Sequence, residues 1–113
     1  PVSVPTLVPV MLAADAQSVR IIDQRRLPDA FIERDLRTVD EVIDAIRTLA
    51  VRGAPAIGVA GAAALAMVAQ DCAAHDAVSA RRQLHAEGTR VADARPTAVN
   101  LRWAVDRVLA CAD

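Results

Sequence analysis

Lysine and tyrosine are absent from this sequence, and Phe31 and Trp103 are its only aromatic residues. All 13 basic residues are therefore arginines, and 14 acidic residues bring the formal net charge to −1. Duplex nucleic acid and acidic membranes attract strongly basic surfaces, and single-stranded nucleic acid binds on aromatic side chains. The composition therefore argues against both kinds of partner, and we expect this protein to bind neither nucleic acid nor a membrane.

Cysteine is scarce as well. Cys72 and Cys111 fit neither the spacing of a metal site nor a disulfide framework, so we expect two small buried residues in a reducing cytoplasm and no metal. The N-terminal region has no basic stretch before its apolar residues, which argues against a signal peptide. The apolar run at 54–69 is rich in alanine and glycine and shorter than the roughly 20 residues that span a bilayer. These features predict a cytoplasmic protein.

The remaining composition is that of a folded domain. Hydrophobic residues form 54% of the 113 positions and charged residues 24%, a balance that argues against disorder. Short apolar and β-branched runs at 7–12, 18–23 and 31–36 predict three strands. Pro9 has no amide hydrogen, so we expect the first strand at an edge of the sheet. The polar residues 13–17 indicate a hairpin between the first two strands, and hence antiparallel pairing.

From residue 38 onward the apolar residues recur at helical spacing. Thr38 and Glu41 have the spacing of a capping box, which predicts the start of the first helix. Three further helices are predicted over 55–72, over 76–91 and from about 96 to the end of the sequence. In the last helix we expect three side chains to point into the core, those of Val99, Trp103 and Val108. Strands followed by helices predict an α+β fold, with a small antiparallel N-terminal sheet of about three strands and a bundle of about four helices.

Two segments place an arginine just before a proline at a predicted helix start, Arg52-Gly-Ala-Pro55 and Arg95-Pro-Thr97. The first amides of a helix have no partner within the helix, and the helix dipole adds partial positive charge there. An arginine beside such a terminus supplies a permanent forked cation, and Gly53 allows a ligand to approach the backbone closely. If the two helix starts meet, they form a phosphate site. The alternative is that each arginine pairs with a carboxylate at the surface.

Other residues have simpler interpretations. Gly58 and Gly61, inside the second predicted helix, favour close packing between helices over contact with a ligand. Asp23 follows the second predicted strand and is expected as a turn or cap partner, with a catalytic carboxylate as the alternative. His75 and His85 lack neighbouring ligand residues and are expected at the surface. No activated nucleophile, Walker-type loop or GxGxxG motif occurs, so the residue patterns alone reveal no catalytic group.

Four segments resemble a known family: Ile22-Asp-Gln-Arg-Arg-Leu-Pro28, Ala45-Ile-Arg-Thr-Leu-Ala-Val-Arg-Gly-Ala-Pro-Ala-Ile-Gly-Val-Ala60, Arg95-Pro-Thr-Ala-Val-Asn-Leu101 and Trp103-Ala-Val-Asp-Arg107. In order and spacing, from about residue 10 to the end, the sequence resembles the N-terminal part of S-methyl-5-thioribose-1-phosphate isomerases. Ribose-1,5-bisphosphate isomerases and the regulatory subunits of the translation-initiation exchange factor share the fold of this family but match these segments less closely.

The resemblance implies an aldose–ketose isomerase of methionine salvage, which converts methylthioribose 1-phosphate to methylthioribulose 1-phosphate without a cofactor. It implies that substrate is bound by Arg52, Gly53, Ala54 and Arg95, which belong to the same two helix starts. Members of the family are longer, and their catalytic cysteine and aspartate lie in a C-terminal Rossmann-like domain.

Residues 1–113 are therefore expected to be the N-terminal domain of a longer isomerase that is homodimeric at full length. The predicted last helix reaches Asp113 without a stop signal, which agrees with this expectation. Neither Cys72 nor Cys111 lies in the family's cysteine motif, so we expect no catalytic residue in this segment and no activity from it alone. The alternative is a non-catalytic module that senses sugar phosphates or docks a partner, similar to the exchange-factor regulatory subunits.

Overall fold

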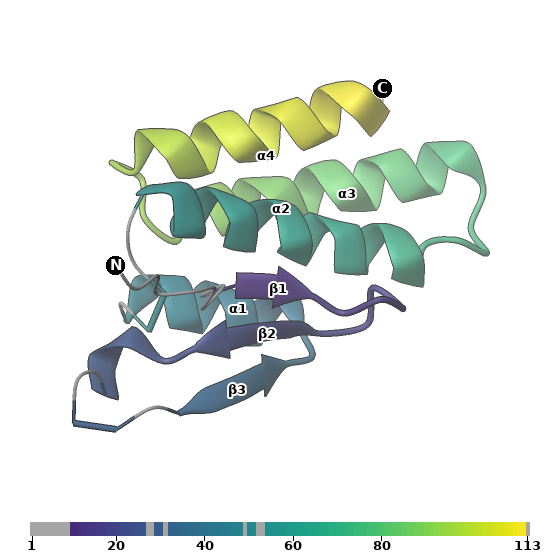
Figure 1. Ribbon diagram of the computed structural model, residues 1–113. Helices are drawn as coiled ribbons and strands as arrows, with labels where there is room; N and C mark the ends of the chain where they lie inside the picture. Colours follow the sequence, from purple (N-terminus) through teal and green to yellow (C-terminus); the bar gives the residue numbers. More distant parts are fainter. Residues whose placement is uncertain (1–9, 27–28, 31, 49, 52–53, 113) are drawn as a thin grey trace, which may run out of the picture.

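In the residues that it describes, the computed structural model contains one three-stranded sheet followed by four α-helices, the α+β fold that the sequence predicts (Figure 1). It describes residues 10–26, 29–30, 32–48, 50–51 and 54–112. The strands are β1 (Val10–Leu12), β2 (Val19–Ile22) and β3 (Glu33–Leu36). The helices are α1 (Val39–Arg47), α2 (Ala54–Asp71), α3 (Ala77–Ala92) and α4 (Val99–Ala112), and a short 3-10 helix η1 (Gln24–Arg26) follows β2. The parts of the predicted strands at 7–9 and 31 lie outside the described residues.

The sheet is antiparallel, with the strand order β1-β2-β3. Val10 pairs with Ile21 and Val19 pairs with Leu36, and all four side chains are buried. Residues directly opposite each other in a sheet share a face, so these pairs define the face that packs on the helices. The strand β1 lies at an edge, as the sequence predicts.

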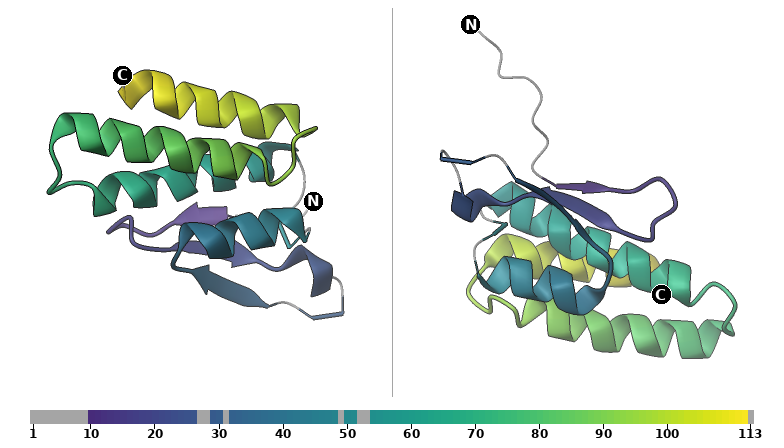
Figure 2. Two further views of the ribbon diagram at one scale, coloured as in Figure 1. Left: turned by 180° about the vertical axis from the view of Figure 1, so that it is seen from behind. Right: turned by 90° about the horizontal axis from the view of Figure 1, so that it is seen from below.

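The helices cover this face in two layers (Figures 1 and 2). The first layer contains α1 and α2, which contact the sheet and each other. The second layer contains α3 and α4, which pack against α2 and against each other. The helix α2 contacts the three other α-helices and the sheet, so its side chains form the centre of the core. Among them, Leu65 and Ala64 are fully buried.

The capping box at the start of α1 is confirmed. The amide of Glu41 donates to the hydroxyl of Thr38 at 3.1 Å, and the amide of Thr38 donates to the carboxylate of Glu41 at 3.2 Å. These bonds satisfy amides that a helix start otherwise leaves without partners. Three of the apolar residues that recur at helical spacing in this helix are buried, Val42, Ile43 and Ile46.

Thr38→Ala is expected to lower the unfolding free energy by about 1 kcal/mol, because it removes the hydroxyl half of the capping box. Urea denaturation measures the change. Thr89→Ala is a matched control: Thr89 is exposed within α3 and donates to the carbonyl of His85 at 3.2 Å. Alanine is the better helix former there, so this variant is expected to be neutral or slightly stabilising. Equal losses in the two variants would contradict a capping role for Thr38.

The glycines of α2 allow close packing against α4, as the sequence predicts. A Cβ built on Gly61 would lie 2.5 Å from Cδ1 of Leu101, closer than two non-bonded carbon atoms can approach. A Cβ on Gly58 would lie 3.3 Å from the carbonyl oxygen of Asn100. The lost helix propensity at these positions is therefore offset by contact between the two helices.

The predicted inward face of α4 is wrong at two of its three positions. Val99 is 78% exposed and Trp103 is 64% exposed, whereas Leu101 and Val105 are buried; Val108 is half-buried. The narrow space beside the α2 glycines holds the aliphatic side chain of Leu101, and the indole of Trp103 lies on the outer side of the helix. There the guanidinium of Arg107 lies 5.3 Å from the ring centroid.

The cysteine prediction is correct for one residue only. Cys72 is buried at the end of α2, but Cys111 is exposed near the end of α4, and both are free thiols. The prediction for Cys111 failed because only one side of α4 faces the core. His75 and His85 are both exposed, as expected. Within the described ranges, no helix has the length and apolar character needed to cross a bilayer.

Candidate functional site

The N-terminal ends of α2 and α4 lie side by side, at the left of Figure 1, and the two helices run parallel. The contact between Gly58, one turn into α2, and Asn100, in the first turn of α4, joins these ends. Each helix start contributes amides without partners in the helix and the positive end of a helix dipole. The two starts therefore meet, which is the condition that the sequence places on a shared phosphate site.

Arg95 lies half-buried in the turn that leads from α3 into α4. Its carbonyl accepts from the amide of Ala98 at 2.9 Å, and the carbonyl of Ala98 accepts from the amides of Leu101 and Arg102. The helix therefore begins at Val99 rather than near 96 as predicted, because a separate turn precedes it. No carboxylate among the described residues forms an ion pair with Arg95. The alternative of a simple surface pair thus finds no support there.

The other predicted substrate-binding residues belong to the start of α2. Ala54 is the first residue of that helix, while Arg52 and Gly53 lie outside the described residues. The described residues directly before them in the chain are Ala50 and Val51, which are both buried. Of the four predicted residues, the structure thus places Ala54 and Arg95, at neighbouring helix starts.

Asp23 is the one buried charged residue among those described, at 2% exposure. Its Oδ1 accepts from the backbone amide of Arg25 at 3.0 Å and from Nε of the same arginine at 2.9 Å, and its Oδ2 accepts from Nη2 at 2.7 Å. Nη1 of Arg34 lies 3.7 Å from Oδ2. The expectation of a turn partner is confirmed by the Arg25 amide. The hydrogen bonds from Arg25 lower the pKa of Asp23 to about 2, against the opposing effect of burial.

Sequence patterns missed what Arg25 does beyond this pair. Its Nη1 donates to Oγ1 of Thr48 at 3.3 Å, at the C-terminal end of α1. The amide of Gln24 donates to the carbonyl of Ala50 at 2.8 Å. These partners are more than 20 positions away, and the only signal in the sequence was that 22–28 carries part of the family resemblance.

Acid is expected to destabilise the fold partly through Asp23. A carboxyl group whose pKa is lower in the folded chain contributes stability above its unfolded pKa, near 3.9, and loses that contribution as the pH falls toward its folded pKa of about 2. The shift corresponds to about 2 kcal/mol, lost between about pH 5 and pH 2. Urea denaturation across this range should show a steeper loss in the wild type than in Asp23→Asn. Parallel pH profiles would contradict a perturbed Asp23.

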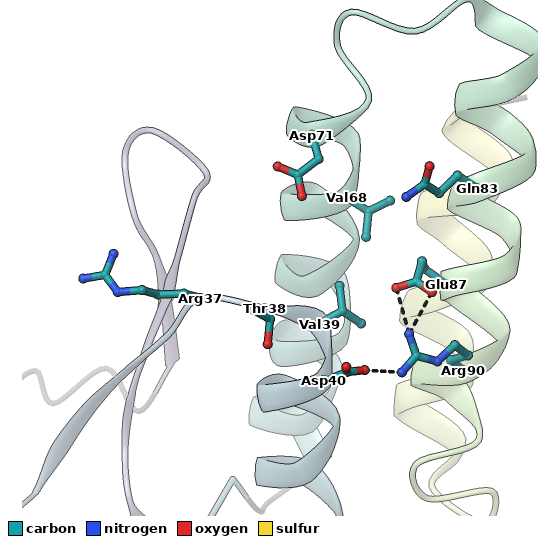
Figure 3. A pocket seen from close by; sticks show the side chains of 9 residues that line it. All are labelled: Arg37, Thr38, Val39, Asp40, Val68, Asp71, Gln83, Glu87 and Arg90. Atoms are coloured by element: carbon teal, nitrogen blue, oxygen red, sulfur yellow. Dashed lines mark hydrogen bonds and ion pairs between the residues drawn. The ribbon is translucent and has the colours of Figure 1, made fainter.

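A separate cleft of about 240 Å³ lies between α1, the last turns of α2 and α3 (Figure 3). Arg90 of α3 donates to Glu87 on its own helix and to Asp40 on α1, so its charge is already paired. These carboxylates raise the pKa of Arg90 above its ordinary value. With Asp71 also on its wall, the cleft carries more acidic than basic groups, and it does not suit a phosphate.

On α2 the cleft in Figure 3 is lined by Val68 and Asp71, in the last turns of the helix and not at its start at Ala54. Among the described residues, no group of three or more histidine, cysteine, aspartate or glutamate side chains has an arrangement that could hold a metal ion. The meeting point of α2 and α4 is therefore the candidate site that the structure favours.

The fold and this site define a class of domain, in which an antiparallel sheet supports a helical bundle that presents two helix N-termini at one end. Residues 50–113 match the Initiation factor 2 subunit family, and the chain belongs to that family.

Individual proteins similar to this chain carry a more specific name than the family. The chain is 49% identical over 102 residues to a methylthioribose-1-phosphate isomerase of Desulfosudis oleivorans, a match that covers 90% of this chain and 27% of that protein. It is 50% identical over 95 residues to the methylthioribose-1-phosphate isomerase of Gemmatimonas aurantiaca, covering 84% of this chain and 28% of that protein. The chain thus spans less than a third of the length of these relatives. The resemblance to the isomerase family is confirmed.

Two solved structures share the fold equally well. A 5-methylthioribose 1-phosphate isomerase from Pyrococcus horikoshii superimposes with a TM-score of 0.83 at 36% identity, over 91% of this chain and 28% of that chain. The translation initiation factor eIF-2B subunit delta from A. fulgidus also gives a TM-score of 0.83, at 35% identity, over 93% of this chain and 30% of that chain. Both an isomerase and an initiation-factor subunit therefore contain this domain.

Proposed function

We propose that this chain is the N-terminal, substrate-binding domain of an aldose–ketose isomerase that converts methylthioribose 1-phosphate to methylthioribulose 1-phosphate. The observation that carries the proposal is the meeting of the α2 and α4 starts, with Arg95 beside one of them, in a chain about half identical to isomerases of that name. The proposed binding residues are Arg52, Gly53, Ala54 and Arg95.

The chemistry explains the need for such a site. Phosphate on the anomeric oxygen of the substrate blocks simple ring opening, so a proton donor must assist cleavage of the ring. A hydrogen must then move between C1 and C2, which requires positioned acid and base groups away from water. Helix amides and arginines hold a phosphate without taking part in these proton transfers. This domain would therefore bind and orient the substrate and form one wall of the active site.

The acid and base groups are proposed to come from the region that follows this domain in the longer relatives. The described residues support this division of labour. Cys72 is buried against the core, Cys111 lies near the end of α4 remote from its start, and Asp23 is held by Arg25. None of these side chains is placed as a reactive group at the helix starts. The domain is cytoplasmic and part of a homodimer in this proposal.

An isomerase assay on the intact protein tests the proposal. Ketose formation from methylthioribose 1-phosphate, followed by NMR, is expected from the protein that carries the following region and not from residues 1–113 alone. Absence of turnover by the intact, folded protein would contradict an isomerase, and turnover by residues 1–113 would contradict the division between domains.

A second function is favoured by the equal similarity to the initiation-factor subunit. In that case the domain would be part of a non-catalytic module that senses sugar phosphates or docks a partner. Isothermal titration with methylthioribose 1-phosphate distinguishes the two: binding by the intact protein without ketose formation favours the module, and binding followed by ketose formation favours the enzyme.

A further inference from the structure

The turn after β2 is tied to the segment that precedes Arg52. Two contacts make this link: the amide of Gln24 donates to the carbonyl of Ala50 at 2.8 Å, and the guanidinium of Arg25 donates to Thr48 at 3.3 Å. Thr48 caps the end of α1, and its own hydroxyl donates to the carbonyl of Asp44 at 2.8 Å. The turn therefore contacts both the end of α1 and the chain that leaves it.

The same segment is held from its other side. The amide of Val51 donates to the carbonyl of Ala45 at 3.1 Å, and Ala50 and Val51 are 0% and 2% exposed. Arg52 is the next residue after Val51, and α2 begins two positions later at Ala54. The two residues directly before Arg52 are therefore held by hydrogen bonds on both sides.

Asp23 holds Arg25 in the orientation that brings its guanidinium to Thr48. The carboxylate accepts from Nε and Nη2, a side-on pair that fixes the plane of the guanidinium and directs Nη1 toward Thr48. Asp23 itself is anchored, since its amide donates to the carbonyl of Ile32 at 2.8 Å beside the sheet. The sheet is thus connected to the end of α1 through the ion pair between buried Asp23 and Arg25, whose own side chain is 38% exposed.

Stability alone gives little reason for such a pair. Burying a carboxylate requires desolvation that the ion pair only offsets, and well-packed apolar residues often stabilise a core as well. A bidentate pair adds direction, and direction matters where a neighbouring cation must meet a phosphate within a fraction of an ångström.

We propose that Asp23 and Arg25 form a clamp on the end of α1 and on Ala50 and Val51, the residues directly before Arg52, and so act as positioning residues for phosphate binding, an inference that rests on the proposed function. Substrate binding at Arg52 weakens when either Asp23 or Arg25 is replaced. Because the phosphate passes through the reaction unchanged, the loss falls on KM rather than on kcat.

Kinetics of the intact protein with methylthioribose 1-phosphate provide the first test. Asp23→Asn and Arg25→Lys are expected to raise KM about tenfold with kcat nearly unchanged. Lysine keeps the positive charge but lacks the planar guanidinium with its paired N–H donors, so it should not form the side-on pair with Asp23. Mere destabilisation gives the opposite pattern, since a smaller folded fraction lowers the apparent kcat and leaves KM unchanged.

Asp35→Asn is the matched control. Asp35 accepts side-on from Nε and Nη2 of Arg20, at 2.9 and 3.3 Å, on the exposed part of the sheet. The same substitution there breaks the same kind of pair, and KM should not change. An unchanged KM in both Asp23→Asn and Arg25→Lys, or an equal rise in Asp35→Asn, would overturn the clamp.

Amide hydrogen exchange separates this proposal from the proposed function. In Asp23→Asn and Arg25→Lys the amide of Val51 is expected to exchange about tenfold faster, while the amide of Leu65 in the core of α2 changes less. If the wild-type protein shows no turnover, the proposed function fails, and the amide exchange rates alone then test the clamp. Faster exchange at Val51 then supports the clamp, and equal changes at Val51 and Leu65 overturn it.

Discussion

Arg95→Ala in the intact protein is expected to raise KM for methylthioribose 1-phosphate by about 10- to 100-fold, with a smaller effect on kcat. Hydrogen bonds to a charged group contribute about 1.5–3 kcal/mol, and every 1.4 kcal/mol is a factor of ten in affinity. The half-buried position of Arg95 before α4 favours the upper part of this range, because a partly desolvated cation interacts more strongly with phosphate. Initial-rate kinetics over a range of substrate concentrations measure the effect.

Arg52→Ala should give the same pattern, since both arginines are proposed to bind one phosphate. Arg102→Ala is the matched control: Arg102 is exposed on α4, and its Nη2 lies 3.4 Å from Asp93. Its loss should leave both kinetic constants near their wild-type values, because exposed ion pairs contribute little. The assignment of the site fails if KM and kcat stay unchanged in both Arg52→Ala and Arg95→Ala.

Leu101→Ala is expected to lower the unfolding free energy by about 2–5 kcal/mol, the largest stability change predicted for this domain. Leu101 is fully buried, and its Cδ1 occupies the space beside Gly61. Gly61→Ala gains helix propensity but places a methyl group into that space, so it is expected to be destabilising by about 1–2 kcal/mol.

The combination of the two substitutions tests the contact itself. Removing Cδ1 of Leu101 makes room for a methyl group at position 61, so the double variant should be more stable than the sum of the single losses implies, by about 1–2 kcal/mol. Urea denaturation of the four proteins gives this coupling. Val59→Ala, at a half-exposed position of α2, should lower the unfolding free energy much less than Leu101→Ala does. Strictly additive losses, or a stabilised Gly61→Ala, would show that the helices do not meet at this glycine.

Features that depend on neighbouring residues could be predicted from the sequence. Thr38 and Glu41 cap α1 because their atoms come within reach as soon as one turn of helix forms. The strand runs and the order of elements follow from local spacing, and so does the α+β class. Gly58 and Gly61 indicated close packing because glycine inside a helix needs a compensating contact.

Features that depend on distant partners could not. Val99 and Trp103 are as apolar as Leu101 and Val105, and only the shape of the space between α2 and α3 determines which pair α4 buries. The exposed position of Cys111 has the same origin. The contacts of Arg25 with Thr48 and of Gln24 with Ala50 likewise join segments that only the folded chain brings together.

The sequence by itself placed an arginine before each of two predicted helices, because prolines and glycines act within one turn, although α4 begins at Val99 and not near 96. Only the tertiary structure decided that the starts of α2 and α4 meet, since two parallel helices can be brought into register only by the packing of their side chains. Local bonding thus sets what each helix end can bind, and long-range packing sets whether two ends can bind the same group.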